Sequence, residues 1–144
     1  MSKLRLIVAA VALAIPLSVV PASAQEGPDS SLVSGSIVLP EGAILPDGVI
    51  VRVSVDDTSR ADAPAITLSR LEMQAPGAGS PIPFALTVLP VALMAHPVVG
   101  PLDITINVRI ESGDGSLLYV NDTAIPAVDA DGPMQGIVVP VISV

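Results

Sequence analysis

The residues of this chain that could do chemistry are few and isolated. His96 is the only histidine, and no acidic residue lies within five positions of it, so a hydrolase would depend on this single base. Asp56 and Asp57 form a carboxylate pair, but adjacent acids in a turn usually face solvent. No Gly-x-Ser-x-Gly motif, phosphate loop or dinucleotide fingerprint occurs. The sequence therefore predicts a protein that is not an enzyme, with no catalytic residues and no cofactor.

Metal binding is not expected either. The Asp129-x-Asp131-Gly132 segment is similar to the middle of a calcium loop, but the alignment places Ala127 at the first ligand position and Val138 where the bidentate glutamate should be. This segment is therefore predicted to be an ordinary turn. One histidine and no cysteine leave no ligand set for zinc, and no disulfide can form.

The charge balance restricts the partners. Residues 25–144 contain four arginines and no lysine against fourteen carboxylates, a formal net charge of −10. Nucleic acids and anionic lipid headgroups both require cationic patches. We therefore expect no nucleic-acid binding, and the charge favours solubility.

Residues 1–24 are predicted to be a cleavable signal peptide. A basic start is followed by the apolar stretch Leu6–Val20 and by a small-x-small site that ends at Ala24, directly before Gln25. The stretch is shorter than the ~20 residues of a membrane-spanning helix, and Pro16 interrupts it. We expect cleavage between Ala24 and Gln25, no stable membrane span afterwards, and a soluble protein that is periplasmic or extracellular.

The elements that must position any site are strands. Residues 25–31 are predicted to be a flexible lead-in, and residues 32–144 one domain. Apolar residues alternate with polar ones at Val49–Val55 and again at Ile104–Ile110, where a Gly-rich turn then predicts a hairpin. Prolines recur through the chain and argue against long helices. The expected fold is all-β, a single antiparallel β-sandwich of about seven strands.

Three other segments carry more specific expectations. Pro81 and Pro83 suggest an edge position for the strand that buries Ile82, Phe84, Leu86 and Val88. Residues 89–101 are apolar without a clear period, which leaves open a short helical turn or an irregular loop under the core. Residues 137–144 are expected to form one last strand.

The order of several segments resembles the YbaY/YscW-type lipoprotein family. The segments are Gly35–Pro40, the strand that closes in Val55-Asp56, the run Asp-Thr-Ser-Arg-Ala-Asp-Ala-Pro at 57–64, Pro81–Phe84, and the hairpin that ends at Asn121-Asp122-Thr123. The resemblance covers roughly residues 33–144. It implies a β-sandwich that faces the periplasm or cell surface, in a group that includes type III secretion pilotins, which help an outer-membrane secretin reach its site.

Two features depart from that family. Its members carry a lipobox cysteine after the signal, whereas this sequence has no cysteine, so the expectation is a form without a lipid anchor. Residues 89–101 are also more apolar than we expect for the corresponding segment of a family member. We expect a non-catalytic envelope protein that binds another envelope or secretion-system protein. The alternative is a structural or self-associating surface protein with strand edges that pair. The oligomeric state stays open.

The candidate partner-binding loop consists of Asp57, Ser59, Arg60 and Asp62. A structural reading is favoured for these residues, because aspartate and serine cap backbone amides in turns while Arg60 pairs locally with Asp57 or Asp62. If the loop does bind a partner, Arg60 is expected to be the anchor. The pattern Asn121-Asp122-Thr123 also matches the acceptor for N-glycosylation and carries little weight here.

Overall fold

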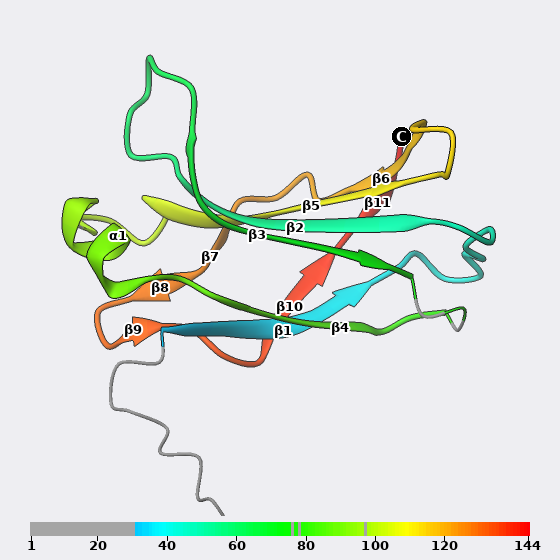
Figure 1. Cartoon of the computed structure of the whole chain (residues 1–144), viewed down its shortest axis with the longest axis horizontal. Coiled ribbons are helices and arrows are strands. Elements are labelled where there is room, and N and C mark those ends of the chain that lie inside the picture. Colours follow the sequence, from blue (N-terminus) through cyan, green and yellow to red (C-terminus); the bar gives the residue numbers. More distant parts are fainter. Residues whose placement is uncertain (1–30, 76, 78, 97) are drawn as a thin grey trace, which may run out of the picture.

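Two β-sheets pack face to face in the computed structural model, which describes residues 31–75, 77, 79–96 and 98–144 (Figure 1). The larger sheet has the order β11-β6-β5-β2-β3, and β7 also pairs with β5. Its strands are β2 (Ile50–Asp57), β3 (Ile66–Gln74), β5 (Ile104–Glu111), β6 (Leu117–Val120), β7 (Ile125–Pro126) and β11 (Ile142–Ser143). The predicted signal peptide and its cleavage site lie outside the described residues.

The smaller sheet has the order β10-β1-β4. Its strands are β1 (Leu32–Val38), β4 (Ile82–Thr87) and β10 (Ile137–Pro140). A separate short hairpin joins β8 (Val128–Asp129) to β9 (Gly132–Pro133), and the helix α1 (Pro90–Ala95) follows β4. Among the described residues no helix has the length and hydrophobicity needed to cross a membrane.

The core lies between the sheets and consists almost entirely of aliphatic side chains. Alternation along β2 buries Val51, Val53 and Val55, and the same pattern buries four residues of β5 at even positions from Ile104 to Ile110. Phe84 is the one buried aromatic residue in the described part of the chain. The prediction of an all-β fold is confirmed. The hairpin through the turn at 112–115 is also confirmed, with Gly115 at a φ of 88°.

Seven strands contain four residues or more, and the others among the described residues contain two each. β4 lies at an edge of its sheet, as its prolines predicted. Strand pairing is antiparallel except between β1 and β10, which run parallel with Gly35 opposite Ile137. Hydrophobic alternation defines which face of a strand is buried, but it does not define the neighbour or the direction of pairing.

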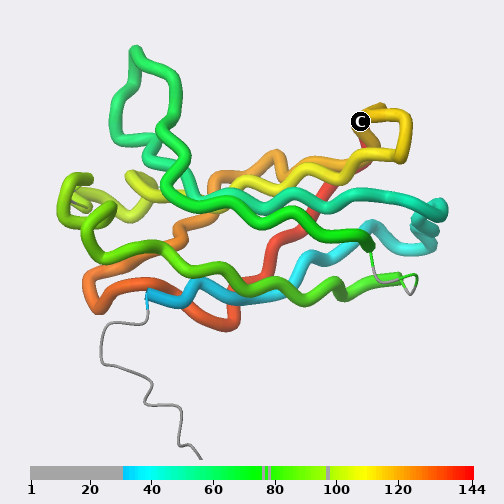
Figure 2. The backbone as a smooth tube through the Cα atoms, in the orientation of Figure 1, coloured from blue at the N-terminus to red at the C-terminus, as the bar shows by residue number. Residues whose placement is uncertain are grey.

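The expectation of one strand over residues 137–144 is wrong. β10 belongs to the smaller sheet and β11 to the larger one, and the chain between them crosses from one sheet to the other (Figures 1 and 2). Pro140 ends β10 because it has no N–H to continue the ladder. The buried Val141 then makes the crossing, and its N–H donates to the carbonyl of Val38 (3.0 Å).

The side chain of Asn121 joins the end of β6 to β5. Its Oδ1 accepts from the Val108 N–H (2.7 Å), and its Nδ2 donates to the carbonyls of Ile106 (3.1 Å) and Thr123 (3.0 Å). These bonds occupy the amide that a glycan would modify. Asn121 is thus a structural residue of the hairpin.

Replacing Asn121 with alanine is expected to lower the free energy of unfolding by about 1–3 kcal/mol, because the partly buried N–H of Val108 loses its acceptor. Urea unfolding followed by circular dichroism measures the change. Asp122→Ala, on the exposed neighbouring residue, is the matched control and should leave the midpoint almost unchanged. Equal midpoints for both variants would contradict the structural role of Asn121.

Candidate functional site

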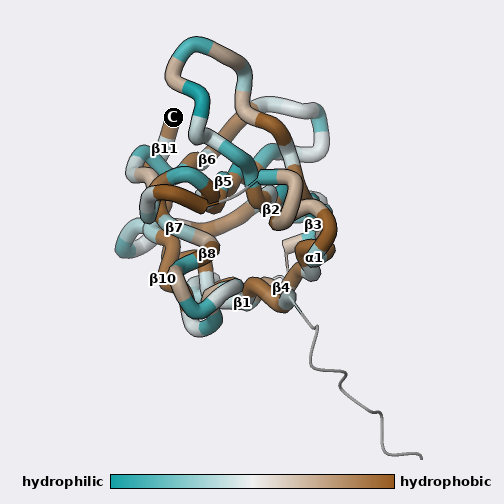
Figure 3. The backbone as a smooth tube through the Cα atoms, turned by 90° about the vertical axis from the view of Figure 1, so that its left-hand side faces the viewer, coloured by the Kyte–Doolittle hydropathy of each residue, from teal (hydrophilic) through white to brown (hydrophobic). Residues whose placement is uncertain are grey.

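One end of the sandwich exposes an apolar surface, which we call the apolar end. It is formed by five residues that are 50–92% exposed, namely Leu89, Val91, Met94, Val99 and Leu102. Figure 3 looks onto this end and colours the α1 segment as hydrophobic. Single exposed apolar residues are ordinary, but several of them between Leu89 and Leu102 form a candidate interaction surface. The apolar end is therefore the first candidate for a functional site.

The helix α1 is apolar throughout, yet none of its residues is buried. Its sequence is Pro-Val-Ala-Leu-Met-Ala, with proline in the first turn and no side-chain cap from Leu89. A surface helix normally combines an apolar face toward the core with a polar face toward water. Within this helix, Leu93 alone packs against the core. The remaining apolar side chains lie on the surface of the described domain.

Residues 89–101 were expected to form either a short helical turn or an irregular loop under the core. A short helical turn does form at Pro90–Ala95, whereas the alternative of a loop under the core is wrong, because the described residues of the segment lie on the outside. Its hydrophobicity was visible in the sequence. The absence of a clear period fits a helix of six residues, which is too short to show one.

His96 fastens the end of α1 to β2. Its backbone N–H donates to the carbonyls of Ala92 and Leu93, and its Nδ1 lies 2.5 Å from Oδ2 of Asp57. An ionised carboxylate can only accept, so Nδ1 carries the hydrogen. Hydrogen bonds from Ser59, and next the contact with His96, hold the pKa of Asp57 below its ordinary value. This contact fixes the position of α1 on the domain.

Asp103 organises the segment that follows α1. Its Oδ2 accepts from the backbone N–H groups of Val99 (2.7 Å) and Gly100 (2.6 Å). Thr58 bonds the same segment from the other side, since its N–H donates to the Asp103 carbonyl (2.7 Å) and its hydroxyl to the Leu102 carbonyl (2.7 Å). These bonds fix the backbone at Val99, which is 92% exposed.

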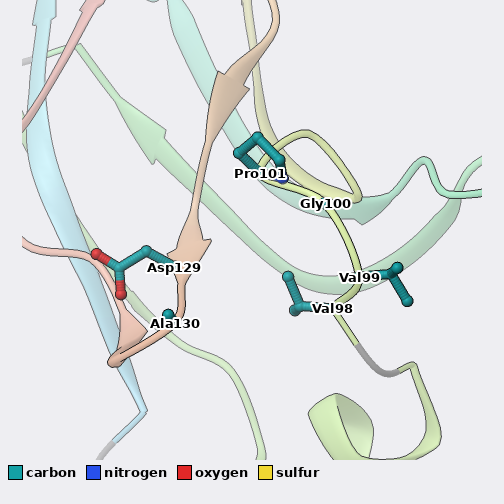
Figure 4. A pocket seen from close by; sticks show the side chains of 6 residues that line it. All are labelled: Val98, Val99, Gly100, Pro101, Asp129 and Ala130. Atoms are coloured by element: carbon teal, nitrogen blue, oxygen red, sulfur yellow. The ribbon is translucent and has the colours of Figure 1, made fainter.

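A cleft of about 410 Å³ lies beside the apolar end, between residues 98–101 and the β8–β9 turn. Figure 4 shows Val98 pointing toward that turn and Val99 pointing away from it. The Asp129 carboxylate points away from Val98, and its Oδ1 accepts from the Asp131 N–H (2.9 Å), as in an ordinary Asx turn. The side chains that face the cleft are therefore mostly apolar.

The predicted partner-binding loop is divided by the structure. Asp57 is buried at the end of β2, and its Oδ1 accepts from both the N–H (2.9 Å) and the hydroxyl (2.6 Å) of Ser59. Neither expected pairing of Arg60, with Asp57 or with Asp62, is found among the described residues, where Asp57 pairs with His96 instead. Of the four candidates, Asp57 and Ser59 are engaged within the fold. Arg60 and Asp62 are exposed in the loop between β2 and β3.

Ser59, Asp57 and His96 meet in space, but their order does not suit nucleophilic catalysis. In a catalytic triad the histidine lies between the serine, which it deprotonates, and the acid that orients it. Here the carboxylate lies between the other two, and the Ser59 hydroxyl donates to Asp57. This arrangement holds α1 and the loop after β2 together.

A second hollow of about 470 Å³ lies on the outer face of β2, β3 and β5. Its main cation, Arg52, is paired with Glu72 (2.9 Å) and with Glu111, which also lies 3.5 Å from Arg109. These arginines lower the pKa of Glu111. Because the charges of this face largely neutralise one another, we regard it as a salt-bridged surface and the apolar end as the better candidate.

The fold is shared with a secretion pilotin. The structure matches an alternative pilotin from the type II secretion system of Vibrio cholerae with a TM-score of 0.63, over 78% of this chain and 97% of that one, at 24% sequence identity. At this identity the match shows the fold alone. Residues 28–138 match the family described as type III secretion system lipoprotein chaperone (YscW), and the chain belongs to this family. The resemblance inferred from sequence is thereby confirmed.

A curated relative agrees with this assignment. The chain is 27% identical over 122 residues to the uncharacterized lipoprotein YbaY of Escherichia coli K12. The matched region is 76% of this chain but only 58% of YbaY, so the chain spans a little over half of that protein. The family description is that of a lipoprotein chaperone of type III secretion, and the matched YbaY is itself described as a lipoprotein.

Proposed function

We propose that this protein is a non-catalytic chaperone of the cell envelope that binds a component of a secretion system through its apolar end. In this proposal the chain is exported, residues 1–24 are removed before Gln25, and the sandwich formed by the rest acts outside the cytoplasm. The observation that carries the proposal is α1, which is apolar throughout with no buried residue. Membership of the secretion-chaperone family supports the same reading.

A bound partner would cover side chains that are otherwise hydrated. Removing apolar surface from water stabilises a complex by roughly 25 cal/mol per Å². The cleft beside α1 adds a concave surface for one or more side chains of the partner. Because His96 and Asp103 fix α1 and the following segment, little ordering is needed on binding.

Crosslinking in the native host tests the proposal. A photoreactive residue placed at Met94 or Val99 of the full chain is expected to capture a secretion-system protein of the envelope. The same group at Ile44, 86% exposed in the loop between β1 and β2, is the matched control and should capture none. Equal capture from Ile44, or capture of no envelope protein at Met94 and Val99, would contradict the proposed function.

A substitution that weakens apolar contact gives a quantitative version of the test. The double change Met94→Ser and Val99→Ser is expected to reduce partner capture at least about tenfold, because both exposed side chains lose contact area in the complex. Its unfolding midpoint should match that of the unmodified chain, since neither side chain is buried. Unchanged capture would place the docking surface elsewhere.

A further inference from the structure

Acidic residues lie in two loops at the same end of the sandwich as α1 (Figure 1). Asp129 and Asp131 lie in and beside the β8–β9 turn, and Asp62 lies in the loop after β2. All three are exposed, and we call them the acidic rim. Arg60 is the one arginine at this end of the described chain, because Arg52, Arg70 and Arg109 line the outer face of the larger sheet. The rim is therefore net negative beside an apolar surface.

The rim argues against two occupants of the apolar end. A bacterial membrane surface is negatively charged, so the rim would be repelled by its headgroups. A second copy bound about a two-fold axis would place the same patch on both sides of the interface, which brings like charges together. A peptide segment with both cationic and apolar side chains would complement the acidic rim as well as the apolar surface.

The geometry separates the two kinds of contact. Side chains that face the cleft are apolar at Val98, Pro101 and Ala130, whereas the Asp129 carboxylate points away from Val98 (Figure 4). An apolar residue of the partner therefore fits the cleft, and a neighbouring cation reaches the outer side of the turn. The volume of about 410 Å³ suits a few side chains of one segment.

We propose that the apolar end takes a short partner segment in which lysine or arginine residues stand next to apolar residues, with the cations facing the acidic rim. This proposal rests on the proposed function and adds the chemistry of the partner. The contacts with α1 supply affinity, while the rim selects for positive charge and speeds association.

Two labelled peptides of equal length test the charge preference. Both carry leucine and valine at the same positions, and the polar positions are lysine in one and glutamate in the other. Fluorescence anisotropy with the full chain, purified after export, measures binding. The lysine peptide is expected to bind at least about tenfold more tightly than the glutamate peptide, and its affinity should fall as salt is raised.

Matched variants assign the preference to the rim. Asp129→Asn together with Asp131→Asn should weaken binding of the lysine peptide about threefold to tenfold and reduce its salt dependence, while the Asx turn keeps its side-chain acceptor. Glu41→Gln together with Asp47→Asn removes two exposed acids from the loop between β1 and β2 and should have no effect.

Each other outcome overturns a stated part of the proposal. Equal affinity for both peptides, abolished by Met94→Ser with Val99→Ser, overturns the charge preference and leaves the docking site. Binding of neither peptide overturns both. Tighter binding to vesicles of phosphatidylglycerol than to the lysine peptide would assign the apolar end to a lipid surface, and concentration-dependent dimerisation lost in Met94→Ser with Val99→Ser would assign it to a second copy.

Discussion

Replacement of Gly35 by alanine is expected to lower the free energy of unfolding by about 3 kcal/mol. A Cβ atom at this position would lie 2.0 Å from the carbonyl oxygen of Ile137, so the backbones of β1 and β10 would have to separate. The loss is a large share of the 5–15 kcal/mol that stabilises a typical domain. Equilibrium unfolding in urea measures it, with secondary structure followed by circular dichroism.

Gly113→Ala is the matched control for this change. A Cβ on Gly113 meets only the carbonyl oxygen of Gly48 at 3.5 Å, which is ordinary van der Waals contact. The control should therefore shift the midpoint little. If Gly35→Ala and Gly113→Ala unfold at the same urea concentration, the close parallel pairing of β1 and β10 is incorrect.

Replacement of Asp57 by asparagine is expected to lower stability at neutral pH by about 1–3 kcal/mol and to weaken attachment of α1. The buried carboxylate accepts two hydrogen bonds from Ser59 and one from His96, and the neutral amide loses their charge-assisted character. Thermal unfolding measures the stability. Hydrogen exchange of residues 90–96 reports the attachment and should accelerate in the variant.

The pH dependence provides a second readout for Asp57. Its pKa in the folded protein is lowered, first by Ser59 and then by His96. The unfolded chain therefore takes up the proton first, so this contribution is complete above the ordinary pKa of about 3.8 and is lost as pH falls through the lower folded value. Below about pH 4 the free energy of unfolding should therefore fall less steeply with pH in Asp57→Asn than in the unmodified chain, because the variant has no carboxylate at this position to protonate.

Asp62→Asn, in the exposed loop of the same segment, is the control for both measurements. It should retain the stability, the exchange rate and the acid sensitivity of the unmodified chain. A loss of stability in Asp62→Asn as large as that in Asp57→Asn would mean that general charge, and not the Asp57 contacts, stabilises this end.

Strand faces were predictable here because burial acts on local sequence. Val51, Val53 and Val55 alternate with polar residues, and the structure buries the valines. Pairing order was not predictable in the same way, since the parallel contact of Gly35 with Ile137 joins residues about one hundred positions apart. The crossing at Val141 lacked a polar break that would have divided residues 137–144 into two strands.

The candidate site was only partly visible in the sequence for a similar reason. Hydrophobicity marked residues 89–101, but local pattern could not say whether they lie inside or outside the core. The contact between His96 and Asp57 spans 39 positions and has no local signal. The run at 57–64 carries the family resemblance, yet two of its four candidate binding residues, Asp57 and Ser59, bond to each other within the fold.

The passage of residues 137–143 from one sheet to the other bears on when the domain can form. β10 pairs with β1 in the smaller sheet, and β11 pairs with β6 in the larger sheet. Neither sheet therefore has all its strands until this segment is present. Contacts between residues so distant in sequence form slowly. A chain still being synthesised would therefore lack a finished sandwich until residues 137–143 had joined both sheets, so we expect closure of the sandwich to be a late step of folding.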